Sequence, residues 1–172
     1  MTVIVGLQHS GHVWLGADSG LSTDGCMAVM ARPKVWTRGR VAFGHAGSLR
    51  VGNVLECAEV PDWDVEMESY RFVVTVLVPA LSDAIEQAGL SFGDDEMLVA
   101  VGRHLYCVDS ELGTHAYSDG YGAVGDVSAT QAALGALHAT AGDLPEQRVR
   151  AALEAAQAFC TTVRRPWSLV RG

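Results

Sequence analysis

Residues 1–20 read M-T-V-I-V-G-L-Q-H-S-G-H-V-W-L-G-A-D-S-G, and they predict a pair of strands on which the rest of the chain packs. The segment 2–8 is rich in valine and isoleucine, which is typical of a strand buried on both faces. Residues 9–11 predict a tight turn, because glycine supplies backbone angles that other residues avoid. Residues 12–18 then predict the return strand, which ends at Asp18.

The second residue combines two reactive groups. Met1 precedes a small residue, so we expect it to be removed, which leaves Thr2 with a hydroxyl and a free α-amine. An α-amine titrates at about 7.7–8.0, so it can accept the proton of the neighbouring hydroxyl. Nucleophile and general base would then belong to one residue. The alternative is that Thr2 is only a processed chain end.

Asp18 and Lys34 follow Thr2 at equal intervals along the chain. A lysine beside the threonine would stabilise the alkoxide, and an aspartate would keep that lysine charged and oriented. This arrangement requires the Lys34 ammonium to lie within about two hydrogen-bond lengths of the Thr2 hydroxyl. The alternative is an ordinary ion pair at the ends of two strands, which contributes little if it is exposed.

Four segments together carry a resemblance to a known family: Thr2, the G-A-D-S-G around Asp18, the R-P-K-V around Lys34 and the G-H-A-G at 44–47. They resemble the N-terminal half of proteasome β-type subunits, and most of all the bacterial peptidase HslV and related small proteasome-like proteins of bacteria and phages. These proteins are N-terminal-nucleophile hydrolases. The resemblance covers most of the chain, since A-V-G-D-V-S-A-T-Q-A-A-L at 123–134 is similar to the family's glycine-serine turn into a helix.

The resemblance also implies which residues surround the nucleophile. Gly47 would offer its backbone N–H to the oxyanion of the tetrahedral intermediate, although it is also typical of a strand-to-helix turn. Gly44 and His45 are expected beside it in the substrate site, with His45 as pocket lining and not as a base. Ser22 and Thr23 lie in the loop that, by resemblance, lines a peptide groove. The polarity of a solvated loop explains these two residues equally well.

One departure from the family pattern concerns Asp126. The family usually has a serine here that helps to hold the terminal amine. An aspartate could accept hydrogen bonds from the ammonium, but it would raise the pKa of that amine and weaken it as a base at neutral pH. Ser128 is a candidate to replace the family serine. Alternatively, Asp126 and Ser128 simply cap the following helix.

The last helix resembles that of HslV, in which backbone carbonyls near the helix end can hold a monovalent cation such as Na⁺. The residues at those positions are Gln157, Cys160 and Val163. The alternative is a helix that ends without an ion. We expect no cofactor to be required for activity.

The order of the remaining elements predicts an α+β fold in a single domain of 172 residues. Strands, two helices, strands and two helices fit two sheets packed face to face between helical layers, and the resemblance implies a four-layer αββα sandwich. A polar loop is expected over 19–25, a turn over 120–122, and a kink or break at Pro79. Further strands are expected from 34 and over 41–44, 97–101, 104–108, 115–117 and 168–170, with helices over 48–58, 67–88, 127–141 and 144–162.

Composition excludes several functional classes. The net charge of −8 argues against a nucleic-acid binder, because phosphate contacts need a basic surface. No apolar run reaches the roughly 18 residues that a membrane span needs, and the start has no secretory signal pattern. Four cysteines without a CxxC motif predict reduced thiols in a cytoplasmic protein, although an even count permits disulfides.

These observations predict a threonine-type endopeptidase that acts on peptides or unfolded proteins. The resemblance implies a homo-oligomeric ring with the sites facing an inner chamber, and it allows an ATPase unfoldase as partner. Two alternatives remain open: a small-molecule amidase on the same scaffold, and a non-catalytic ring subunit that keeps the fold for assembly.

Overall fold

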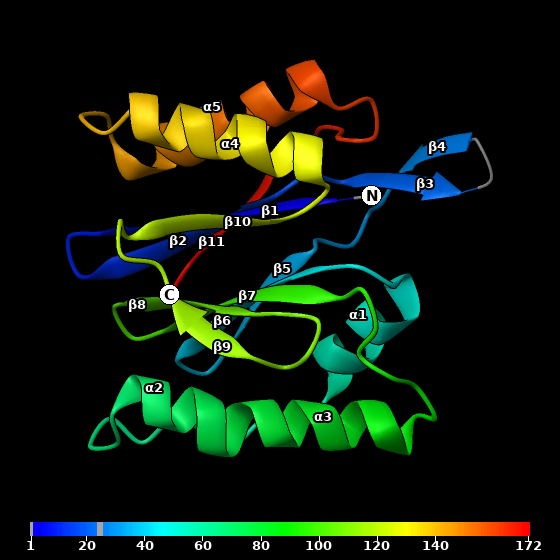
Figure 1. The fold of residues 1–172 in the computed structure, drawn as a ribbon, viewed down its shortest axis with the longest axis vertical. Helices are drawn as coiled ribbons and strands as arrows, with labels where there is room; N and C mark the ends of the chain where they lie inside the picture. Colours follow the sequence, from blue (N-terminus) through cyan, green and yellow to red (C-terminus); the bar gives the residue numbers. More distant parts are fainter. Residues whose placement is uncertain (1, 24–25) are drawn as a thin grey trace.

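The computed structural model describes residues 2–23 and 26–172. Figure 1 shows four layers stacked along the long axis: a pair of helices, a first sheet, a second sheet and a further helical layer. The expected four-layer αββα sandwich is confirmed. Each helical layer covers the outer face of one sheet, and the inner faces of the two sheets pack against each other.

The first sheet is built around the chain's opening strand. Its order is β10-β1-β2-β11, with every neighbouring pair antiparallel. In β1, Val3 and Val5 pack toward the helices while Ile4 packs toward the second sheet, which confirms a strand buried on both faces. The strands are β1 (Val3–His9), β2 (His12–Ala17), β10 (Tyr121–Gly125) and β11 (Ser168–Arg171).

The second sheet has the order β5-β6-β7-β8-β9 and is also antiparallel. All of β6 is buried, because Ala42 faces the first sheet and Phe43 faces the helices on the other side. The strands are β5 (Val35–Arg38), β6 (Val41–Ala46), β7 (Glu96–Val101), β8 (His104–Val108) and β9 (Thr114–Ala116).

The helical layer on the second sheet contains α1 (Leu49–Cys57) and one long helical segment. Ser48 caps α1 as expected, since its hydroxyl accepts from the Val51 N–H. The long segment consists of α2 (Ser69–Phe72), a π-helical turn η1 (Val73–Leu77) and α3 (Val78–Gln87). Pro79 lacks an N–H to donate to the preceding turn, and the wide π turn stands just before it. The irregularity expected at Pro79 is therefore a π turn.

The other helical layer consists of α4 (Val127–Ala139) and α5 (Pro145–Phe159), which lie side by side over β1 and β2. Small side chains let these helices approach each other and the sheet closely. The fully buried alanines at these contacts are Ala129, Ala133, Ala152 and Ala156.

Two expectations about loops are wrong. The loop expected over 19–25 contains β3 (Gly20–Thr23), which pairs with β4 (Cys26–Val29) as a ribbon beside the main sheets. The side chains of β4 are all exposed, so it has no buried periodicity from which to predict it. The turn expected over 120–122 ends at Gly120, and Tyr121 already begins β10, whose glycines are held in place by pairing with β1.

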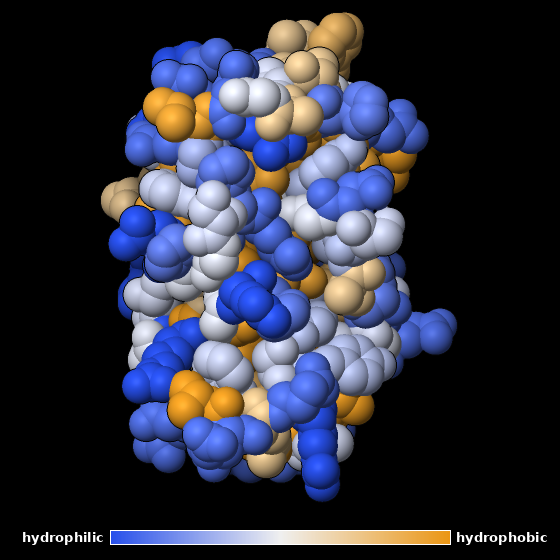
Figure 2. Space-filling model, turned by 90° about the vertical axis from the view of Figure 1, so that its left-hand side faces the viewer, coloured by the Kyte–Doolittle hydropathy of each residue, from blue (hydrophilic) through white to orange (hydrophobic). Residues whose placement is uncertain are grey.

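The surface carries no broad apolar face on the side shown in Figure 2. That side lies at the left of Figure 1, and its apolar atoms form small separate groups among hydrophilic ones. Among residues 2–23 and 26–172, no helix has the length and apolar character needed to cross a bilayer. All four cysteines are free, which agrees with reduced thiols.

Candidate active site

Thr2 lies directly before β1 and is anchored by its backbone. Its carbonyl accepts from the Asp126 N–H at 2.9 Å, and the next N–H, from Val3, donates to Asp18 Oδ1 at 3.2 Å. The start of the chain is therefore held between the end of β2 and the beginning of α4. This anchoring leaves the Thr2 side chain free to reach the end of the second sheet.

Lys34 is the residue directly before β5, and its side chain extends to Thr2. Its Nζ donates to Thr2 Oγ1 at 2.7 Å, to Asp18 Oδ1 at 2.9 Å and to the Gly20 carbonyl at 2.6 Å. The ammonium group has three N–H bonds, and these three acceptors engage all of them. The charge is thus aimed at the threonine hydroxyl, within the reach that the sequence analysis required.

Asp18 holds the other members of this network in place, and its side chain is completely buried. Besides Lys34 and Val3, it accepts from the Gly20 N–H at 2.7 Å and from the Arg164 N–H at 3.3 Å, both on Oδ2. A buried carboxylate is costly unless it is paired and hydrogen-bonded, and here both oxygens are satisfied. The pair with Lys34 is therefore a buried ion pair and not the exposed one of the alternative interpretation.

The environment of Lys34 acts on its acidity in two directions. Burial lowers the pKa of Lys34 below its ordinary value of 10.5, while the charge and hydrogen bond of Asp18 raise it. The net direction is downward because the loss of hydration is the larger effect. The ammonium is consequently a stronger hydrogen-bond donor to Thr2 than a lysine in water.

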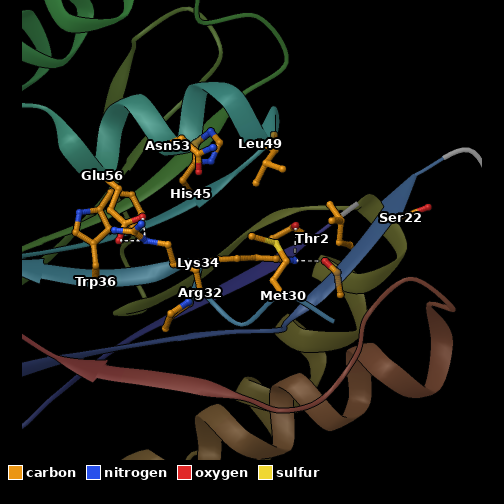
Figure 3. Close-up of a pocket in the computed structure, with 15 residues that line it drawn as sticks. Thr2, Ser22, Met30, Arg32, Lys34, Trp36, His45, Leu49, Asn53 and Glu56 are labelled. Atoms are coloured by element: carbon orange, nitrogen blue, oxygen red, sulfur yellow. Dashed lines mark hydrogen bonds and ion pairs between the residues drawn. The ribbon is translucent and has the colours of Figure 1, made fainter. Parts of the chain in front are cut away.

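Thr2 and Lys34 open onto a pocket of about 250 Å³ (Figure 3). Gly47 lines the same pocket, at the turn between β6 and α1, with a φ of +145° that favours glycine. A backbone N–H at this turn therefore borders the pocket onto which the threonine hydroxyl opens, which is where an oxyanion donor is needed. The rest of the wall is mixed, with apolar surface from Met30, Trp36 and Leu49.

Three charged residues of the pocket region were missed in the sequence. Arg32 and Glu56 form an ion pair with Nε–Oε2 at 2.8 Å at the end where Trp36 lies, as Figure 3 shows. Asp95, which precedes β7, binds the His45 ring with its Oδ1 2.8 Å from Nε2. The only signal for Asp95 was its place before the apolar run of β7, since that strand pairs with the one carrying His45.

Solved structures with the same architecture match almost the whole chain. BPH from Thiobacillus denitrificans in complex with epoxomicin is 18% identical with a TM-score of 0.81, and the match covers 99% of this chain and 97% of that one. The fold is of the proteasome type. HslV from Trypanosoma brucei is 18% identical with a TM-score of 0.73 over 98% of both chains. The Gly-1 mutant of Anbu from Hyphomicrobium sp. strain MC1 is 14% identical with a TM-score of 0.75, covering 99% of this chain and 80% of that one.

The resemblance inferred from the sequence motifs is thus confirmed for the fold. No protein-family model matches the sequence, and a search of curated proteins found no match. Identities this low show the fold and not the chemistry, which depends on the residues of this chain's own site.

Within the proteasome-type fold, the predicted substrate-site residues fall in different places. Ser22 is on β3 and lines the pocket, at the end away from Trp36 in Figure 3. The side chain of Thr23 lies outside the described part of the structure, as do Met1, Asp24 and Gly25. His45 lines the pocket but is buried, and burial lowers its pKa against the opposing effect of Asp95. Gly44 lies in the core between the sheets, where a Cβ would collide with Ile4.

Asp126 and Ser128 lie at the start of α4, as the capping interpretation predicted. Asp126 is the N-cap, and its Oδ1 accepts from the N–H groups of Ser128 and Ala129 at 3.0 and 3.2 Å. Its pKa is lowered, first of all by the hydrogen bond from the Ser128 hydroxyl. The contact of Asp126 with Thr2 is made by its backbone N–H.

The three residues considered for a cation lie around the end of α5. Gln157 is in the last turn, Cys160 is the C-cap and Val163 follows in a buried turn. The Cys160 carbonyl accepts from the Val163 N–H at 3.3 Å, which leaves one of its two lone pairs for an ion. Carbonyl oxygens are suitable ligands for a hard cation, but the Val163 carbonyl already accepts from Arg164 Nη1 at 3.4 Å. In the described part of the chain, His, Cys, Asp and Glu side chains form no cluster of three or more that could hold a metal.

Proposed function

We propose that this protein is a threonine-type endopeptidase of the N-terminal-nucleophile kind, with Thr2 as its nucleophile. The observation that supports the proposal is the contact of 2.7 Å between Lys34 Nζ and Thr2 Oγ1, made by a lysine that a fully buried aspartate holds in place. Such a network has an obvious chemical use at a threonine hydroxyl that lines a pocket, since it stabilises negative charge on that oxygen.

The proposed reaction cleaves an amide bond in two steps. The α-amine of Thr2 takes the hydroxyl proton, and the Oγ1 attacks the substrate carbonyl while Lys34 stabilises the developing charge. The Gly47 N–H binds the oxyanion of the tetrahedral intermediate. The amine product leaves with the proton, so an ester to Thr2 remains. Water, deprotonated by the same α-amine, then hydrolyses that ester and restores the hydroxyl.

This chemistry requires that Met1 is removed, because a peptide bond would abolish the basicity of the Thr2 nitrogen. Met1 lies outside the described residues, so the requirement rests on the sequence, in which a small residue follows the methionine. Intact mass spectrometry of the purified protein tests it directly. A retained methionine would favour the non-catalytic subunit.

The proposed enzyme works in the cytoplasm as a homo-oligomeric ring, with peptides or unfolded chains as substrates. Exposed apolar side chains on one side of the molecule support assembly: the β3–β4 ribbon, the start of α4 and the end of α5 all lie at the right of Figure 1. They carry Met27, Val29, Val127 and Phe159, the last with 77% of its surface exposed. Light scattering tests the ring, and a single-chain mass would favour the small-molecule amidase.

An ATPase unfoldase partner and a Na⁺ ion at the end of α5 are part of the proposal but not needed for its chemistry. Cleavage of unfolded casein without nucleotide, compared with cleavage when a copurified ATPase is present, tests the first. Replacement of NaCl by choline chloride in the peptidase assay tests the second.

Replacement of the nucleophile is the decisive experiment. Thr2→Ala removes the hydroxyl but keeps a small second residue, so Met1 is still expected to leave, and Thr2→Ser keeps the hydroxyl as a matched control. We expect fluorogenic peptides to be cleaved by the wild type and by Thr2→Ser, and the rate of Thr2→Ala to fall by about 10³-fold or more. Epoxomicin is bound in the Thiobacillus BPH structure. We expect the intact mass of the wild type to increase by the mass of epoxomicin, and the mass of Thr2→Ala to stay unchanged.

Equal cleavage by the wild type and Thr2→Ala would end the proposal, because the activity would then come from another site or a contaminant. If the wild type carries Met1, the same assay on protein with an engineered, cleavable leader before Thr2 separates a blocked amine from an inert site.

A further inference from the structure

The buried pair of His45 and Asp95 lies beside the turn that carries the proposed oxyanion donor. A single oxygen, Asp95 Oδ1, accepts from the Ser48 backbone N–H at 2.7 Å and lies 2.8 Å from His45 Nε2. Asp95 has only 3% of its surface exposed. These two contacts join residues on either side of Gly47, so the carboxylate spans the turn.

The turn is shaped to receive this carboxylate. A Cβ on Gly47 would collide with Asp95 Oδ1, so the glycine is needed for the close approach as well as for its φ of +145°. Gly47 lines the pocket with Thr2 and also borders a second hollow that contains Asp95 and Ser48 but not Thr2. The turn therefore separates the nucleophile on one side from the carboxylate on the other.

His45 contacts Asp95 from the side on which the pocket lies. Its ring lines the pocket and packs so closely on α1 that a Cβ added to Gly52 would lie 2.8 Å from Nδ1. Figure 3 shows the ring beside Asn53 of the same helix. The ring cannot shift toward α1, and Asp95 holds it from the opposite side.

We propose that Asp95 is a positioning residue that fixes the peptide planes of the turn at Gly47, so that the Gly47 N–H points at the site of the oxyanion. The inference rests on the proposed function, because it concerns the same reaction. A backbone N–H can stabilise an oxyanion only when its direction is set in advance, and a glycine turn has the widest choice of directions. The bond from Ser48 to Asp95 removes that choice at the next peptide unit.

The charge of Asp95 does not oppose this role. A bare carboxylate behind an oxyanion site would disfavour negative charge there, but this one accepts from a backbone N–H and from the imidazole. Burial lowers the pKa of His45, which favours the neutral ring that donates through Nε2. A neutral acceptor of the same shape should therefore position the turn almost as well as the carboxylate.

The test compares Asp95→Ala with Asp95→Asn, which keeps an oxygen at the same place. Asp94→Ala is the matched control, because Asp94 is the exposed neighbour with the same charge. A misplaced catalytic group costs on the order of 10²-fold in rate, so we expect kcat of Asp95→Ala to fall about 10- to 100-fold with KM changed less than threefold. Asp95→Asn should retain at least a third of wild-type kcat, and Asp94→Ala should retain all of it.

Amide hydrogen exchange gives a readout that does not depend on activity. The Ser48 amide should exchange at least tenfold faster in Asp95→Ala than in the wild type, and its rate should be unchanged in Asp94→Ala. Unchanged exchange at Ser48 overturns the inference even if no variant cleaves peptide. A wild-type kcat in Asp95→Ala, or an Asp95→Asn variant no better than Asp95→Ala, also overturns it. An inactive wild type with the expected exchange pattern counts against the peptidase alone.

Discussion

Removal of charge from Asp18 is the most informative perturbation of the network at Thr2. Asp18→Asn preserves the shape of the side chain but gives it one NH₂ group. In one orientation that NH₂ faces the N–H of Val3 and the ammonium of Lys34, and in the other it faces the N–H groups of Gly20 and Arg164. In either orientation the NH₂ group faces two hydrogen-bond donors and can accept from neither, because all four partners of the Asp18 carboxylate are donors.

The magnitude follows from burial. Asp18 is fully buried and the Lys34 side chain is only 8% exposed, so Asp18→Asn leaves an uncompensated buried ammonium, which costs about 3–5 kcal/mol. Lys34→Met removes the ammonium and leaves a carboxylate that still accepts three backbone N–H bonds, so we expect a smaller loss of about 1.5–3 kcal/mol. The double variant contains no unpaired charge, and its loss should fall short of the sum by about 1–3 kcal/mol.

Urea denaturation followed by circular dichroism measures these free energies, and the exposed pair of Glu146 and Arg150 is the control. That pair has a similar N–O distance, 2.8 Å against 2.9 Å, but about half of each side chain is exposed, so its coupling should be about 0.3–0.5 kcal/mol. All three variants at Asp18 and Lys34 should lose peptidase activity. A coupling energy between Asp18 and Lys34 no larger than that of the control pair would refute the reasoning.

Two further predictions concern the neighbours of the site. Asp126→Ala should destabilise the protein by about 0.5–2 kcal/mol, because α4 loses its N-cap. Asp126→Asn should change stability and kcat little, because asparagine also caps helices. A large loss of kcat in Asp126→Asn would instead favour a role of Asp126 at the terminal amine. Burial lowers the pKa of His45 below 6.5, so as the pH falls below that value His45 takes up a proton in the unfolded chain before it does so in the folded protein. The free energy of unfolding therefore decreases by up to about 1.4 kcal/mol per pH unit until the pH reaches the pKa of His45 in the folded protein. His45→Gln should lose less stability than the wild type between pH 7 and pH 5 in thermal unfolding, and parallel losses would contradict this assignment.

Local patterns in the chain predicted most elements and the central trio of the site. The β1–β2 hairpin follows from a valine-rich run, two turn residues with positive φ and a return strand, all within one stretch of sequence. Thr2, Asp18 and Lys34 were found because each lies in a short motif of recognisable type. β4 and β10 were missed for opposite reasons: β4 is exposed, and β10 is rich in glycine and is a strand because β1 pairs with it.

By itself, the sequence determined which groups are available: a hydroxyl at the second residue, one aspartate and one lysine in register, and a glycine turn at the end of a buried strand. Only the tertiary structure decided that Asp126 caps a helix, that Gly44 packs against Ile4 and that Asp95 contacts His45 and Ser48 on either side of Gly47. The physical reason is separation along the chain. His45 and Asp95 are 50 residues apart, and no local periodicity records a contact that exists only because β6 and β7 pair side by side.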